Sequence, residues 1–137
     1  MKKLILISLF TPILSFSQSS KPAIKFINQA RSYFYFEKLK NDKNLSKKAE
    51  VWAKHIANVD SLELSTDEHG EALFRIKLTE GKTIKNIFLD SAVAWLLEKD
   101  TPEYYQLLCS DCSKIGFGLA ENDKYIYVVA KYDKLYE

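Results

Sequence analysis

Residues 114–133 constrain the fold more than any other segment, because they predict a β-hairpin whose second strand is apolar on both faces. In the first half, large side chains alternate with small ones: Ile115, Phe117 and Leu119 with Gly116, Gly118 and Ala120. This period of two is typical of a strand. Residues 121–124 are polar and predict the turn, and residues 125–132 are rich in aromatic and β-branched side chains. A strand with two apolar faces is usually covered on both sides, so we expect a layer of structure on each face of this sheet.

The first 17 residues predict a secretory signal peptide. Lys2 and Lys3 precede an apolar run at residues 4–10, and Ser15 and Ser17 place small residues where a signal peptidase reads the chain. The segment is too short to span a membrane. We expect cleavage after Ser17, a mature domain of residues 18–137, and secretion or release into a periplasm. No cysteine lies near the cleavage site, which argues against a lipid anchor.

Charge excludes one class of partner. The segment 1–17 holds two of the 20 basic residues and none of the 18 acidic ones, so the mature chain has a formal charge of zero. No basic stripe with interleaved aromatic residues is present, and we therefore expect no nucleic-acid partner. No second long apolar run follows, so we expect no transmembrane segment in the mature chain.

Two cysteines, Cys109 and Cys112, form a C-x-x-C pair. In an exported chain an isolated pair favours a structural disulfide. Two alternatives stay open at this stage. The cysteines can be two small buried apolar residues, or a redox-active pair, although a redox motif usually sits in a thioredoxin-like context that this sequence lacks.

The remaining elements follow from apolar periodicity. Residues 22–36 predict a first helix, with Ser19 or Ser20 as its cap; its aromatic end at residues 33–36 can line a groove, although such clusters are more often core. Residues 43–59 predict a second, strongly amphipathic helix. Residues 72–79 alternate as a strand, residues 84–98 predict a broadly apolar helix capped by Thr83, and residues 102–109 predict a short helix capped by Asp100 or Thr101. Helices around a small antiparallel sheet give a three-layer α/β/α sandwich.

Four motifs, in order, resemble those of one family. Asn28 and Arg31 resemble its N-x-x-R element, and residues 64–71 resemble its H-S-x4-G-E-N element. Residues 95–98, which read Trp-Leu-Leu-Glu, resemble W-x-x-E, and residues 104–118 resemble H-F-T-Q-x-x-W followed by x-G-x-G. The chain is thus similar to the CAP superfamily, which comprises cysteine-rich secretory, antigen-five and pathogenesis-related-one proteins. The resemblance covers nearly all of residues 18–137 and implies an exported α/β/α sandwich with a cleft.

In many members of that superfamily the cleft carries two histidines and two glutamates that can hold a divalent metal. Glu71 and Glu98 match the two glutamates, but Leu64 and Glu103 stand where the histidines belong. Leucine cannot bind a metal ion, so the resemblance implies a degenerate site, and we expect no metal or other cofactor. The alternative is a looser site made by His69, Glu71 and Glu98, or a hard cation held by the carboxylates with Glu103.

The sequence favours a non-catalytic, CAP-like binding or interaction module. Its predicted contact region is a cleft shared by the facing carboxylates of Glu71 and Glu98. The other residues expected there are His69, Glu103, Tyr104 and Tyr105. The partner is an unidentified small apolar ligand, peptide or protein. The first alternative is a peptidase-like hydrolase that uses Glu71 and Glu98 for acid–base chemistry. Against catalysis, the two glutamates can have a structural role, in which they hydrogen-bond backbone amides or an arginine such as Arg31 or Arg75. The second alternative is a structural component of the cell envelope.

Overall fold

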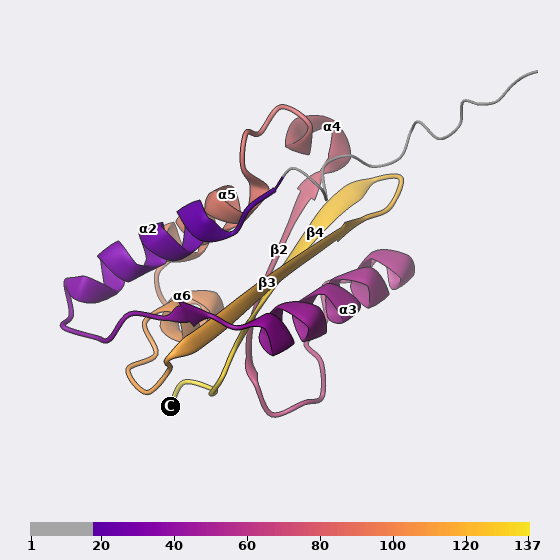
Figure 1. The fold of residues 1–137 in the computed structure, drawn as a ribbon. Helices are drawn as coiled ribbons and strands as arrows, with labels where there is room; N and C mark the ends of the chain where they lie inside the picture. The colour runs from indigo at the N-terminus through magenta and orange to yellow at the C-terminus, as the bar shows by residue number, and fades with distance from the viewer. Residues whose placement is uncertain (1–17) are drawn as a thin grey trace, which may run out of the picture.

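The computed structural model describes residues 18–137, and a four-stranded sheet forms its middle layer (Figure 1). The strand order across the sheet is β1-β3-β4-β2. The strands are β1 (Lys40–Asn41), β2 (Gly70–Lys77), β3 (Lys114–Glu121) and β4 (Tyr125–Tyr132). The predicted hairpin is confirmed, because β3 and β4 pair antiparallel from Ile115 opposite Tyr132 to Glu121 opposite Ile126. The predicted signal peptide lies outside the described residues.

Helices cover both faces of the sheet, which confirms the predicted three layers. Helix α3 (Lys43–Val59) packs alone on one face, where Ala49, Ala53 and Ile56 meet Tyr127 and Val129. The opposite face carries α2 (Lys21–Ser32), α5 (Ile87–Leu97) and α6 (Pro102–Leu107) over a larger apolar core. Strand β4 is buried between these layers from Ile126 to Tyr132, as its two apolar faces require.

Gly116 and Gly118, on one face of β3, allow α3 to pack close to the strand. A Cβ atom added at Gly116 would overlap the backbone of Leu45 and Ser46, and one added at Gly118 would overlap the backbone of Ala49 and Glu50. The alternation of large and small residues therefore has a direct packing reason. The large residues fill the core on the other face, where Phe117 packs against Phe88 and Trp95.

Helix boundaries differ from the predicted ones by more than one residue at three places. Helix α2 ends at Ser32 rather than at residue 36, since a tight turn follows it. Helix α5 begins at Ile87 rather than at residue 84, because the side chain of Asn86, not Thr83, caps it by accepting from the N–H of Leu89. Helix α6 ends at Leu107, two residues early, where the chain turns into the segment that holds the cysteines. Helix α3 has the predicted bounds.

Two short elements were not predicted. Strand β1 pairs parallel with β3, so the sheet is not purely antiparallel. Helix α4 (Leu78–Gly81) replaces the end of the predicted strand, which runs over Gly70–Lys77 instead of residues 72–79. Both elements consist of two to four residues, too few for a periodic pattern to reveal them.

The outer strand β2 is partly protected along its free edge. Trp95 of α5 donates its indole N–H to the backbone carbonyl of Leu73 at 2.8 Å, which satisfies one edge acceptor. Among residues 18–137 no helix is both long enough and apolar enough to cross a membrane.

We expect Gly118→Ala to lower the free energy of unfolding by about 2 kcal/mol or more, because the new methyl group overlaps the backbone of α3 rather than a movable side chain. The control is Gly81→Ala, whose Cβ meets side-chain atoms of Ile126 and Ile76 instead of backbone. Chemical denaturation of both variants measures the difference; equal stabilities would contradict the close approach of α3 to β3.

Candidate functional site

Glu71, the first of the two glutamates matched to the family cleft, lies on β2 and is paired with a buried lysine. Its Oε2 is 2.5 Å from Nζ of Lys131, and the two side chains are 3% and 2% exposed. The backbone N–H of Ser65 donates to Glu71 Oε1 at 2.9 Å, and the Ser65 hydroxyl contacts Oε2. The expectation that Glu71 binds a backbone amide is met, but its cationic partner is Lys131 rather than Arg31 or Arg75.

The same lysine holds the loop before β2. Lys131 Nζ lies 2.6 Å from Asp67 Oδ2 and 3.0 Å from the Ser65 hydroxyl. Burial raises the pKa of Asp67, but the hydrogen bonds from Lys131 and from the backbone N–H of His69 outweigh it and lower that pKa to about 2. The His69 Nδ1 atom is buried, has no hydrogen-bond partner, and lies 3.6 Å from Asp67 Oδ1. Ser65, Asp67 and Glu71 therefore share one buried lysine.

Glu71 and Glu98 belong to layers on opposite faces of the sheet. Glu71 alternates with Ala72 along β2 and lies on the α3 face with Leu73. Glu98 is exposed where α5 ends, in the layer on the other face. Glu103 lies in the first turn of α6 in that same layer. The structure therefore does not bring the two matched glutamates to one shared hollow, because the sheet lies between their layers.

The predicted cleft residues consequently divide into two groups. His69 and Glu71 belong to the Lys131 cluster. Tyr104 lines a hollow on the opposite side of the sheet. Tyr105 donates its hydroxyl to Asp100 at 2.6 Å, a bond that raises the pKa of Tyr105, and its ring stacks on Tyr136.

The residues present do not fit the metal site that the superfamily resemblance implies. Within residues 18–137 no three His, Cys, Asp or Glu side chains converge where they could hold a metal ion. Leu64, at the position of the first histidine, is exposed and offers no ligand atom. Glu71 already neutralises Lys131, so its oxygens are engaged. The alternative set of His69, Glu71 and Glu98 is not assembled.

An apolar groove lies instead between the C-terminal ends of α2 and α5 and the start of α6. It has a volume of about 620 Å³. Its lining consists of Phe26, Gln29, Ala30, Tyr33, Phe34, Leu96, Leu97, Lys99 and Tyr104. Several apolar side chains at its mouth are exposed to solvent: Tyr33 by 85%, Phe34 by 50% and Leu97 by 73%. We call these nine residues the aromatic groove.

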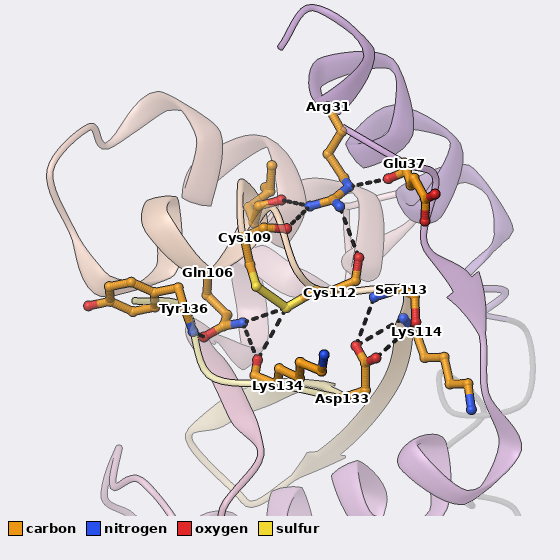
Figure 2. Close-up of a disulfide and its surroundings, with 11 residues drawn as sticks. Arg31, Glu37, Gln106, Cys109, Cys112, Ser113, Lys114, Asp133, Lys134 and Tyr136 are labelled. Atoms are coloured by element: carbon orange, nitrogen blue, oxygen red, sulfur yellow. Dashed lines mark hydrogen bonds between the residues drawn. A yellow bond between two sulfur atoms is a disulfide. The ribbon is translucent and has the colours of Figure 1, made fainter. Parts of the chain in front are cut away.

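Buried Arg31 fixes the turn that supplies Tyr33 and Phe34 (Figure 2). Its Nε donates to the carbonyl of Glu37 at 2.9 Å, which closes the turn after α2. Its Nη atoms donate to the carbonyls of Leu107, Cys109 and Cys112 at 3.0, 2.8 and 3.1 Å. Burial lowers the pKa of Arg31, opposed in part by nearby groups such as Asp133. One guanidinium thus ties the aromatic turn to the end of α6.

Cys109 and Cys112 form a disulfide within the segment that Arg31 holds. Gln106 donates its amide N–H to Cys112 Sγ and to the carbonyl of Lys134, and it accepts from the backbone N–H of Tyr136. The disulfide spans only three positions of sequence, so it constrains the unfolded chain little and acts locally. It shapes the carbonyl cage around Arg31 and the path of the C-terminal tail.

The N-x-x-R motif is therefore the sequence signal for this turn. Asn28 makes two hydrogen bonds with the backbone of Leu39, at 3.0 and 2.7 Å. Arg31 makes the four hydrogen bonds to backbone carbonyls described above. Together they clamp the chain before and after residues 33–36. Residues 33–36 were expected in the core, with a groove as the alternative; in the structure Tyr33, Phe34 and Tyr35 are exposed, and Tyr33 and Phe34 line the groove.

Comparison with known families decides the relationship. The family model for CAP, described as the cysteine-rich secretory protein family, matches residues 24–132. The chain belongs to the CAP family. The resemblance read from the four motifs is confirmed, as is the α/β/α architecture.

Solved structures share this CAP fold at low sequence identity. NaASP2 with Zn²⁺ is 14% identical and has a TM-score of 0.70, with 91% of this chain and 82% of that chain covered. A hookworm platelet inhibitor is 17% identical, with a TM-score of 0.62 over 82% of this chain and 67% of its own. An outer surface protein from Borrelia burgdorferi is 17% identical, with a TM-score of 0.57 over 85% of this chain and 96% of its own. No curated protein matches the sequence.

The lowered pKa of Asp67 predicts a specific acid sensitivity. A carboxyl group whose pKa is lower in the folded than in the unfolded state stabilises the fold above its unfolded value, near 3.8, and loses that contribution as the pH falls toward 2. We expect Asp67→Asn to be less stable than the parent protein at pH 5. The difference should shrink between pH 4 and 2.

The measurement is a set of urea unfolding curves at pH 5, 4, 3 and 2. Glu68→Gln is the control, because this neighbouring exposed carboxyl shows no ion pair within residues 18–137. A pH-independent gap between Asp67→Asn and the parent would show that Asp67 does not use its charge to hold Lys131.

Proposed function

We propose that this CAP domain is an exported, non-catalytic binding module and that the aromatic groove is its contact region. The observation that carries the proposal is the exposure of Tyr33, Phe34 and Leu97 around one hollow. Soluble domains rarely leave large apolar side chains clustered on the surface unless the cluster meets a ligand or partner. A groove of about 620 Å³ is within the range of ligand sites in proteins.

The anchoring of the groove supports the same proposal. Its aromatic turn is tied back to α2, because the side chains of Arg31 and Asn28 hydrogen-bond the backbone of Glu37 and Leu39, which follow the turn. A preformed surface loses little conformational entropy when a partner binds. The groove residues thus combine two properties of a binding site, exposure of apolar area and rigid support beneath it.

The hydrolase alternative has less support. Acid–base catalysis by Glu71 needs a carboxylate that can exchange protons with a substrate, whereas Lys131, buried beside it, holds this one in an ion pair. The contact between the Ser65 hydroxyl and Lys131 Nζ resembles a serine–lysine pair. Two carboxylates, however, keep that lysine occupied as a cationic donor. Glu98 lies in a different layer and cannot complete the pair.

Export is proposed on the composition of residues 1–17 and on the family. The matched model describes secretory proteins. Two structural neighbours, a platelet inhibitor and an outer surface protein, have names that place their action outside a cell or at its surface. The partner proposed here is a small apolar ligand, a peptide or a protein that inserts apolar groups into the groove.

The aromatic groove should bind an apolar fluorescent probe such as anilinonaphthalene sulfonate, with bound-state fluorescence lost in Leu97→Asp. A charge placed at the mouth of the groove disfavours an apolar guest there. Leu97 is exposed in the protein, so the substitution should leave the melting temperature nearly unchanged.

Val51→Asp is the matched control, because Val51 is also exposed, by 68%, but lies on α3 across the sheet. Probe titrations of the three proteins by fluorescence decide the matter. Equal affinity in Leu97→Asp and the parent would show that the groove is not the apolar contact region.

Glu71→Gln separates the binding module from the hydrolase. We expect it to lower the free energy of unfolding by about 3 kcal/mol, since it leaves Lys131 buried beside a neutral amide. A hydrolase would instead lose peptide turnover. Denaturation curves and a peptidase assay on the parent protein and the variant distinguish the two. Turnover by the parent that Glu71→Gln abolishes would establish the enzyme.

A further inference from the structure

A second hollow lies on the other side of α2. It has a volume of about 560 Å³, is lined by Lys21, Lys25 and Lys38 together with uncharged residues, and shares Gln29 with the aromatic groove. Helix α2 thus forms a ridge between an aromatic hollow and a basic one. A partner that lies across this ridge reaches both.

All the charged residues that line the two hollows are basic. Their linings contain four lysines, the three above and Lys99, and no aspartate or glutamate. Within residues 18–137 none of the four makes an ion pair. The chain from residue 18 onward is nevertheless neutral overall, so the linings of the two hollows are more basic than the chain as a whole. Surface charge of this kind favours an anionic partner and speeds its association.

Tyr35, at the tip of the adjoining turn, is in an unfavourable backbone conformation. Its φ is 60°, in the left-handed region, and its side chain is 96% exposed. The N–H of Phe36 donates to the carbonyl of Arg31 and that of Tyr35 to the carbonyl of Ser32, the pattern of a Schellman helix end. Glycine is preferred at this position because it has no Cβ. An exposed tyrosine there destabilises the fold and makes no packing contribution in return.

We propose that the ridge of α2 binds an acidic polypeptide segment that carries aromatic or apolar side chains. The inference rests on the proposed function and names the class of partner. Apolar side chains of the segment enter the aromatic groove, its carboxylates meet Lys21, Lys25 and Lys38, and Tyr35 packs against it at the turn. The partner then accounts for a tyrosine at this unfavourable backbone position, because the exposed ring of Tyr35 contacts it.

The concave shape of both hollows favours a polypeptide over a lipid bilayer. Individual side chains fit hollows of 560 and 620 Å³. A flat bilayer would touch the exposed side chains at the rims, such as Tyr33, Tyr35 and Leu97, and leave the hollows unfilled. The surface combines tyrosine rings, an apolar hollow and a polar rim, and protein–protein interfaces commonly have this composition.

The experiment uses the purified protein and a fluorescently labelled random copolymer of glutamate and tyrosine, with polyglutamate, a lysine–tyrosine copolymer and phosphatidylglycerol vesicles as comparison probes. We expect the glutamate–tyrosine copolymer to bind most tightly and its affinity to fall with added salt. The double variant Lys25→Glu/Lys38→Glu should weaken this binding by about tenfold or more. The control Lys77→Glu/Lys82→Glu changes the net charge equally on exposed residues outside both hollows and should change the affinity by less than about twofold.

Tyr35→Gly distinguishes a binding role from a structural one. We expect it to raise the melting temperature, because glycine relieves the left-handed strain, while it weakens copolymer binding. Weaker binding with a lower melting temperature would indicate that Tyr35 supports the fold instead.

Each other outcome overturns the inference in a recognisable way. Tighter binding to the vesicles than to the copolymer would assign the ridge to membranes. Equal binding of the polyglutamate and mixed copolymers would exclude the aromatic contribution. The parent protein can also fail to bind the copolymer while it still binds the apolar probe through Leu97. That result would contradict the acidic partner but leave the proposed function of the aromatic groove intact.

Discussion

The buried guanidinium of Arg31 is the interaction on which the accessible part of this molecule depends. It is fully buried, and it has four backbone carbonyls as acceptors rather than a carboxylate. A buried charge without partners is costly, so the surrounding chain must place those carbonyls accurately. The disulfide segment, the end of α6 and the turn after α2 are consequently held together. The aromatic groove is built on this junction, so the exposed apolar turn is supported from beneath by these hydrogen bonds.

The sheet separates two sites that a reading of family motifs places together. On the α3 face, the motif glutamate on β2 is committed to Lys131 and the loop of residues 65–69. On the other face, Glu98 lies near the aromatic groove, exposed and without the opposite carboxylate. Because Lys131 engages Oε2 of Glu71, this glutamate is not free to bind a metal ion on the α3 face.

Local sequence patterns predicted the elements whose cause is local. Helix α3 was predicted with its observed bounds, because its apolar stripe is long and Asp42 caps it. The β3–β4 hairpin followed from the alternation of large and small residues, whereas the close approach of α3 to Gly116 and Gly118 was not predicted. The predicted end of α2 and the predicted start of α5 were wrong by several residues. Hydrogen bonds of Arg31 hold the turn that ends α2, and the side chain of Asn86 caps the start of α5. Apolar periodicity does not report such contacts. The two shortest elements, β1 and α4, carry no periodic signal at all.

The sequence by itself determined the layers and the family, because each depends on residue type and order along the chain. Only the tertiary structure decided the pairing of Glu71 with Lys131, 60 residues away, and the separation of Glu71 from Glu98 by a sheet. It also decided that residues 33–36 lie outside the core. The physical reason is the same in each case: burial and partnership are properties of three-dimensional neighbours, and an aromatic or charged residue has the same letter whether it is exposed, buried or paired.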